Sequence, residues 1–177
     1  MKVALACENP NFVAGVEKGF SKYYDEDFRL KNYLFSSAKG IENIGSKVFI
    51  NADKKLWKLR QEVNEPFDLL TVVEDGLFSK GGDFYYYVVT LIQLENNREV
   101  EYKGTSVGLM IPENKQIMIL NKCFSTVYSD DDLKKISKGI LSYEVLAQQA
   151  AESALAAMSI WNPKLHWYFQ CSFCVVT

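Results

Sequence analysis

Hydrophobic residues along the chain follow two periodicities, and each predicts a different kind of element. Short apolar runs at residues 2–7 and 69–73 are typical of strands buried on both faces, and the aromatic-rich run at 28–35 suits a further strand. Apolar residues recur every three or four positions over 12–23 and over 48–63, which predicts two amphipathic helices. A turn at 8–11 and a loop at 36–46 connect these elements.

Turn and cap signals organise the rest of the chain. A hairpin turn is predicted at 80–83, and a second turn at 95–98 joins β-rich runs at 84–94 and 100–110. Pro112 opens a short predicted helix through 120, and Ser129 is a predicted N-cap of another. An alanine-rich helix is predicted over 142–160, stopping before Pro163.

These elements predict one α/β domain over residues 1–177. Its mixed twisted sheet should have antiparallel hairpins in the middle and helices packed on it, with the strands at 2–7 and 69–73 in the parallel part. No repeat, low-complexity tract or Gly/Ser/Pro-rich linker divides the chain.

Composition narrows the classes of partner. A chain of 177 residues with 48% hydrophobic positions can bury a core without metals or disulfides. Its 20 basic and 22 acidic residues give a net charge of −2, which argues against bulk capture by nucleic acid or by an anionic membrane but leaves a local basic pocket open. No run approaches the roughly 20 apolar residues of a membrane helix, and only four cysteines occur, so a cytoplasmic protein is predicted.

The acidic pair Glu74 and Asp75 is the first candidate for chemistry. It follows the strand-like run at 69–73, where ligands bind at the carboxyl ends of strands in open α/β sheets. Two such carboxylates can hold Mg²⁺ while one orients a water molecule. The alternative is that the two residues form a solvent-exposed turn without a ligand.

Two weaker candidates lie at the ends of the chain. The first strand-to-helix turn, residues 7–11, could bind phosphate through its free backbone N–H groups, although Asn9 or Asn11 could cap the helix instead, which is the commoner role for such residues. His166, Cys171 and Cys174 supply only half of a zinc site, so ordinary packing is favoured. The apolar residues 171–177 have no assigned function, and their character favours docking over free solvation.

Several short segments, taken in order, carry a family resemblance. They are residues 3–10 with the helix that follows, Ile44-Gly45-Ser46, residues 72–77, residues 106–112 and residues 138–142. In this order the chain resembles the inosine/xanthosine triphosphatase family and the related C-terminal domain of a eukaryotic proline-rich coiled-coil protein. The resemblance implies hydrolysis of non-standard purine nucleoside triphosphates with Mg²⁺ or Mn²⁺, and a homodimer. It also implies that Glu74 and Asp75 bind the metal and that Asn9, Ser46 and Lys138 contact phosphates.

Four positions depart from the charged pattern of that family: Phe12, Lys47, Val48 and Gln148. Each lost charge-assisted contact to a triphosphate typically costs about 1.5–3 kcal/mol. The sequence therefore supports two hypotheses, a metal-dependent triphosphatase or a catalytically silent relative that binds a nucleotide or a protein. Lys47, or a shifted residue such as Lys18 or Lys54, is a candidate to supply the missing positive charge.

Overall fold

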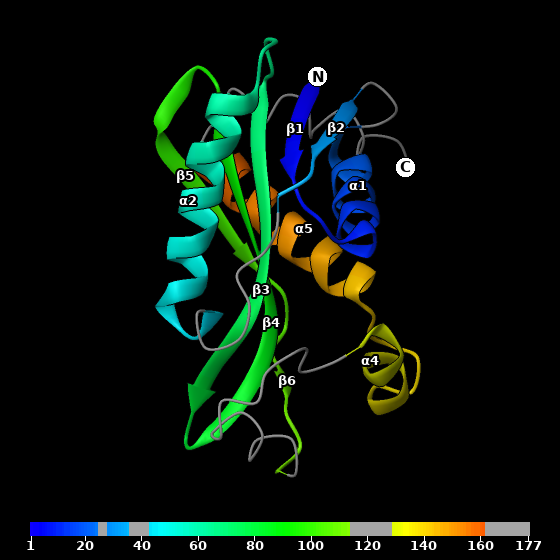
Figure 1. Ribbon diagram of the computed structural model, residues 1–177. Coiled ribbons are helices and arrows are strands. Elements are labelled where there is room, and N and C mark those ends of the chain that lie inside the picture. The colour runs from blue at the N-terminus through cyan, green and yellow to red at the C-terminus, as the bar shows by residue number, and fades with distance from the viewer. Residues whose placement is uncertain (25–27, 36–42, 114–128, 162–177) are drawn as a thin grey trace.

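A mixed sheet with helices on both faces forms the framework of the protein (Figure 1). The computed structural model describes residues 1–24, 28–35, 43–113 and 129–161. The strands run in the order β2-β1-β3-β4-β5, and β6 pairs with β4. Their bounds are β1 (Lys2–Ala6), β2 (Arg29–Tyr33), β3 (Leu69–Lys80), β4 (Asp83–Leu94), β5 (Asn97–Thr105) and β6 (Leu109–Met110).

The sheet combines two kinds of pairing. β1 is parallel to both of its neighbours, β2 and β3, whereas β4 is antiparallel to β3, β5 and β6. The predicted α/β fold class, with a parallel part and antiparallel hairpins, is confirmed. The run predicted as one strand over 100–110 is interrupted between β5 and β6.

Helices cover the two faces unequally. α1 (Pro10–Tyr24) and α5 (Tyr143–Trp161) pack on one face, and α2 (Ser46–Glu62) packs on the other. The short helix α4 (Asp130–Ile136) precedes α5. Each face has its own core. The core between the sheet and α1 and α5 contains Val16, Phe20, Val73 and Leu155, and the core between the sheet and α2 contains Val48, Leu56, Leu59 and Val72.

β3 is much longer than the sequence predicted. The sequence predicted a strand over residues 69–73 bounded by Glu74-Asp75-Gly76, but β3 continues to Lys80. It pairs with β4 along its whole length, from Leu69 opposite Leu94 to Lys80 opposite Asp83. The long hairpin partner keeps the acidic pair within regular strand structure.

Two predicted caps are present. The Asn9 side chain accepts a hydrogen bond from the Asn11 backbone N–H at 2.9 Å, and the Asn9 carbonyl accepts the first helical bond from Val13. Ser129 and Asp132 form a reciprocal capping box at the start of α4. The helix predicted over 112–120 falls mostly outside the described residues, as do His166, Cys171 and Cys174. Among the described residues, no helix has the length and apolar character that crossing a bilayer requires.

Candidate functional site

The acidic pair lies where the parallel part of the sheet ends. β1 pairs with β3 as far as Ala6 opposite Val72, so Glu74 and Asp75 come just past the end of β1. Because successive side chains of a strand point to opposite faces, the two carboxylates are directed to different sides of the sheet. Glu74 joins residues of the α2 side, and Asp75 joins residues of the α5 side.

On the α2 side, Glu74 forms a buried ion pair. The Lys55 ammonium nitrogen lies 2.5 Å from one Glu74 carboxylate oxygen, and the side chains are 5% and 1% exposed. Lys55 also donates to the Val73 carbonyl at 3.3 Å. α2 places Lys55 here because the same helical surface carries Ala52, Leu56 and Leu59 into the core.

An asparagine pair completes the surroundings of Glu74. The Asn43 amide donates to the other Glu74 oxygen at 3.4 Å and to the Asp75 carbonyl. The Asn51 amide of α2 donates to the Asn43 side-chain oxygen at 3.0 Å. The segment that holds Asn43 runs beside β3, since Ile44 forms a parallel bridge with Leu77. Both Glu74 oxygens are therefore engaged by groups of the chain itself.

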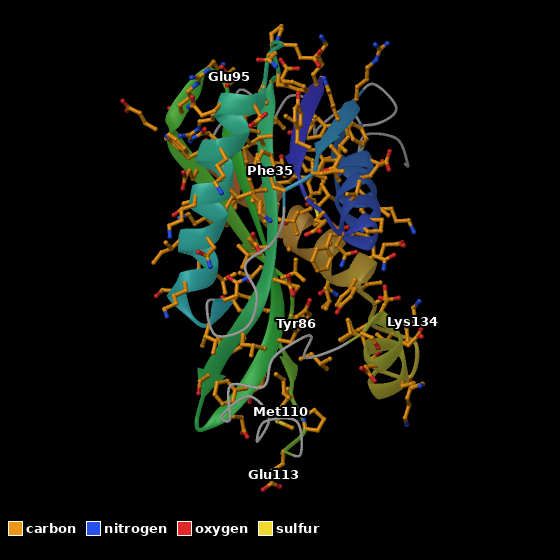
Figure 2. All side chains as sticks on the ribbon, viewed as in Figure 1. Phe35, Tyr86, Glu95, Met110, Glu113 and Lys134 are labelled. Carbon is orange, nitrogen blue, oxygen red and sulfur yellow. The ribbon has the colours of Figure 1, made fainter. Side chains whose placement is uncertain are left out.

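On the α5 side, Asp75 belongs to a chain of tyrosines. Tyr86, on the face of β4 that α5 covers (labelled in Figure 2), donates its hydroxyl hydrogen to an Asp75 carboxylate oxygen at 2.9 Å. A hydrogen bond joins Tyr86 to Tyr143, the first residue of α5. The Tyr143 backbone N–H donates to Asp130 of α4 at 2.7 Å. The network thus ties β3 and β4 to the starts of α4 and α5.

Burial dominates the electrostatics of both acids. It raises the pKa of the Glu74 carboxyl, while the Lys55 ammonium and the Asn43 amide oppose that shift. Burial likewise raises the pKa of Asp75, against the lowering effect of the Tyr86 hydroxyl. At the end of β1, burial raises the pKa of the Cys7 thiol to about 11, so this cysteine is held as the neutral thiol rather than the nucleophilic thiolate.

The acidic pair does not fit the shared Mg²⁺ or Mn²⁺ site that the sequence predicted. A hard dication needs several oxygen ligands converging on one point, whereas Glu74 and Asp75 diverge and each already has a hydrogen-bond or ionic partner. Within the described ranges, no three His, Cys, Asp or Glu side chains form a group suited to a metal.

The predicted phosphate contacts are spread over separate elements. Asn9 caps α1, Ser46 is exposed as the first residue of α2, and Lys138 is exposed after α4 with a φ of 54°. α1 and α2 cover opposite faces of the sheet. In the described part of the chain, no hydrogen bond or ion pair joins any two of these three residues.

The four departures from the family pattern have distinct structural roles. Phe12 is 2% exposed and packs edge-to-face against Tyr143, with ring centroids 5.3 Å apart. Val48 is fully buried in the core under α2. Lys47 is exposed, and Gln148 donates to Glu152 within α5 at 2.7 Å.

The proposed replacements for the lost charge are also accounted for. Lys18 forms an ion pair with Glu144, and Lys54 is exposed on α2.

Sequence reasoning missed the residues that surround the acidic pair. Lys55 sits at i+7 from Val48 and i+3 from Ala52, on the edge of the apolar stripe of α2, and that position was the available signal for its burial. Tyr86 and Tyr143 come from segments 57 residues apart in the sequence, and no local pattern connects them.

Comparisons with known proteins identify the fold alone. No protein-family profile matches the chain, and no curated protein matches it in sequence. Among solved structures, protein VC0702 from Vibrio cholerae is similar with a TM-score of 0.68 at 15% sequence identity, covering 92% of this chain and 96% of that one. At this identity the similarity supports the α/β architecture and carries no statement about activity.

Proposed function

We propose that this chain is a binding module with a triphosphatase-like fold, and that Glu74 and Asp75 do not form a hydrolytic metal centre. The ion pair between Lys55 and Glu74 carries the proposal. The Lys55 ammonium neutralises the charge that would attract a dication. A metal taking its place would leave a lysine buried without its partner, which is costly.

The departures from the family pattern support the same conclusion. Phe12 and Val48 fill the two cores at positions where the family resemblance implies charged groups for the triphosphate and metal. A charged side chain at either position would lose apolar packing and bear the cost of desolvation. At these two positions the chain has core residues in place of the charged side chains that would bind a triphosphate or a metal.

An interaction role is supported by what faces solvent. Large apolar side chains that gather on a polar surface mark contact sites more often than isolated ones do. Ile50 and Trp57 are 48% and 59% exposed, and both lie on α2. The carboxylate oxygens of Glu74 already have partners within the chain, namely Lys55 and Asn43. A partner molecule would therefore bind at an exposed surface such as that of α2.

Nucleotide turnover tests the proposal directly. Inosine, xanthosine and ordinary nucleoside triphosphates are incubated with the wild-type protein and Mg²⁺ or Mn²⁺, and released phosphate and pyrophosphate are measured. We expect no release above the protein-free control, for wild type and for Glu74→Gln alike. Cation-dependent turnover by the wild type would overturn the proposal, and its loss in Glu74→Gln would support the sequence-based metal prediction instead.

The homodimer implied by the family resemblance is a separate proposal. Sedimentation velocity over a range of protein concentrations tests it: a stable dimer sediments with twice the mass of one chain at every concentration, a weak dimer loses mass on dilution, and a monomer keeps the mass of one chain, which would contradict the proposal.

A further inference from the structure

α2 has a second face that the core does not use. Its inner residues, among them Val48, Ala52, Leu56 and Leu59, are fully buried. We call the exposed residues Lys47, Ile50, Lys54, Trp57 and Lys58 its outer face; Ser46, Gln61 and Glu62 are exposed at the two ends of the helix. The outer-face positions follow one another at spacings of three and four, with Lys58 beside Trp57, so they form a single stripe along the helix. The stripe alternates positive charge with large apolar side chains.

The outer face carries three lysines. Lys47, Lys54 and Lys58 form no ion pair with any residue in the described part of the chain. Of the nearby acids, Asp53 lies 3.8 Å and Glu101 3.5 Å from the Lys103 ammonium, and Glu62 is exposed one turn beyond Lys58 at the end of α2. Among the described residues, the three lysines of the outer face are therefore available to an anionic partner.

The outer face also contrasts with the rest of the protein. The three lysines of the outer face contribute a charge of +3, while the whole chain has a net charge of −2. The remaining residues thus carry −5. Net charge is an average over all faces of the molecule. A chain with a net negative charge can therefore still attract an anionic membrane through one basic face of one helix.

We propose that the outer face of α2 binds the anionic surface of a phospholipid bilayer. Lysines attract acidic headgroups, and tryptophan is enriched at the level of those headgroups. Ile50 and Trp57 would enter the interface between the lysines, as in helices that lie in the plane of a membrane. Because the inner face of α2 is fixed in the core, the helix needs no refolding to present this face.

A protein partner is the alternative occupant, and the residue types favour lipid. Lysine is depleted in protein–protein interfaces, where arginine is preferred. All three basic residues of the outer face are lysines. α2 packs on the sheet through its inner face (Figure 1), which leaves the outer face on the side away from the sheet.

Vesicle co-sedimentation tests the proposal with a defined probe. The full chain is mixed with two kinds of vesicle: phosphatidylcholine alone, and phosphatidylcholine with about 30% phosphatidylserine, which gives an anionic surface. We expect binding to the anionic vesicles only, weakening as salt is added. Lys54→Glu/Lys58→Glu should lower the partition coefficient about 30-fold or more, because each lysine near the surface contributes roughly a fivefold factor.

A matched charge control separates the outer face from net charge. Lys80→Glu/Lys135→Glu changes the net charge by the same amount at two exposed lysines of β3 and α4. It should bind anionic vesicles within about twofold to threefold of the wild type. Circular dichroism of each variant establishes that it is folded.

Trp57 provides a second readout. In a Trp161→Phe/Trp167→Phe background Trp57 is the remaining tryptophan of three, and its emission should shift to the blue with anionic vesicles and not with neutral ones. Trp57→Ala should weaken binding.

Three outcomes would overturn the proposal: no preference for anionic vesicles, an equal loss in both charge-reversal pairs, or no response of Trp57. Binding of a synthetic acidic amphipathic peptide at Trp57 without vesicle binding would assign the face to a protein partner. The proposal deepens the proposed binding function, and the nucleotide assay remains independent of it. If the protein both hydrolyses nucleotides and binds vesicles, only the non-catalytic assignment is refuted. If it does neither, only the lipid site is refuted.

Discussion

The ammonium nitrogen of Lys55 lies 2.5 Å from a carboxylate oxygen of Glu74, and the two side chains are 5% and 1% exposed. A buried pair of this kind contributes less to stability than its short distance suggests, because both charges lose their hydration. Its effect is strongest when one partner is removed, since the other is then left charged in the core.

Lys55→Met should therefore destabilise the protein by about 3–5 kcal/mol. The double variant Lys55→Met/Glu74→Leu should recover most of that loss, because it removes both buried charges and keeps apolar volume. Urea denaturation of the two variants and the wild type measures this. Equal stability of single and double variants would contradict the interpretation of a coupled pair.

The pH dependence of stability should report on Asp75. Burial raises the pKa of Asp75 above its ordinary value of 3.8, so between that value and the folded pKa the folded state binds more protons than the unfolded chain. The contribution of Asp75 is present in full below pH 3.8 and declines as pH rises through the folded pKa.

Asp75→Asn keeps an acceptor for the Tyr86 hydroxyl and removes the titration. Relative to the wild type, the variant should therefore gain stability as pH rises from about 4 to 7. Unfolding free energies at a series of pH values check the sign. A difference between variant and wild type that stays constant with pH would argue against a raised pKa.

Gly104 of β5 should not tolerate a side chain. A Cβ atom built there would lie 2.2 Å from the Ala150 carbonyl oxygen and 2.2 Å from the Ala154 backbone nitrogen, so α5 approaches the strand at backbone contact. Gly104→Ala should cost about 1–3 kcal/mol or more, because helix and strand would have to separate.

Gly81→Ala is a suitable comparison for that change. Gly81 has a φ of 65° and open space around its Cβ position, so alanine there should cost only the backbone strain of about 1–2 kcal/mol. Thermal unfolding of both variants ranks the two effects. A smaller loss for Gly104→Ala than for Gly81→Ala would show that α5 moves away at little cost.

Asn9 should act on helix stability rather than on ligand binding. Asn9→Ala removes the acceptor of the Asn11 N–H and should destabilise the protein by about 0.5–2 kcal/mol. Asn9→Asp, which can also cap, should lose much less. Chemical denaturation measures both, and equal losses in the two variants would indicate a different role for the side chain.

Much of the fold could be predicted because its signals are local. The apolar runs that became β1 and the start of β3, the helical stripes of α1 and α2, and the Ser129 cap each depend on neighbours within a few positions. The extension of β3 could not be read in the same way. Glu74-Asp75-Gly76 has the composition of a turn, and only pairing with β4 makes it a strand.

The chemistry of the acidic pair shows the same division. Two adjacent carboxylates near the end of the parallel strands were evident in the sequence. Where the side chains point was decided by tertiary pairing, because a turn allows neighbouring carboxylates to converge whereas a strand sends them to opposite faces. The helix then brought Lys55 to Glu74, and β4 with α5 brought Tyr86 and Tyr143 to Asp75, from positions too distant in sequence for any local pattern to encode.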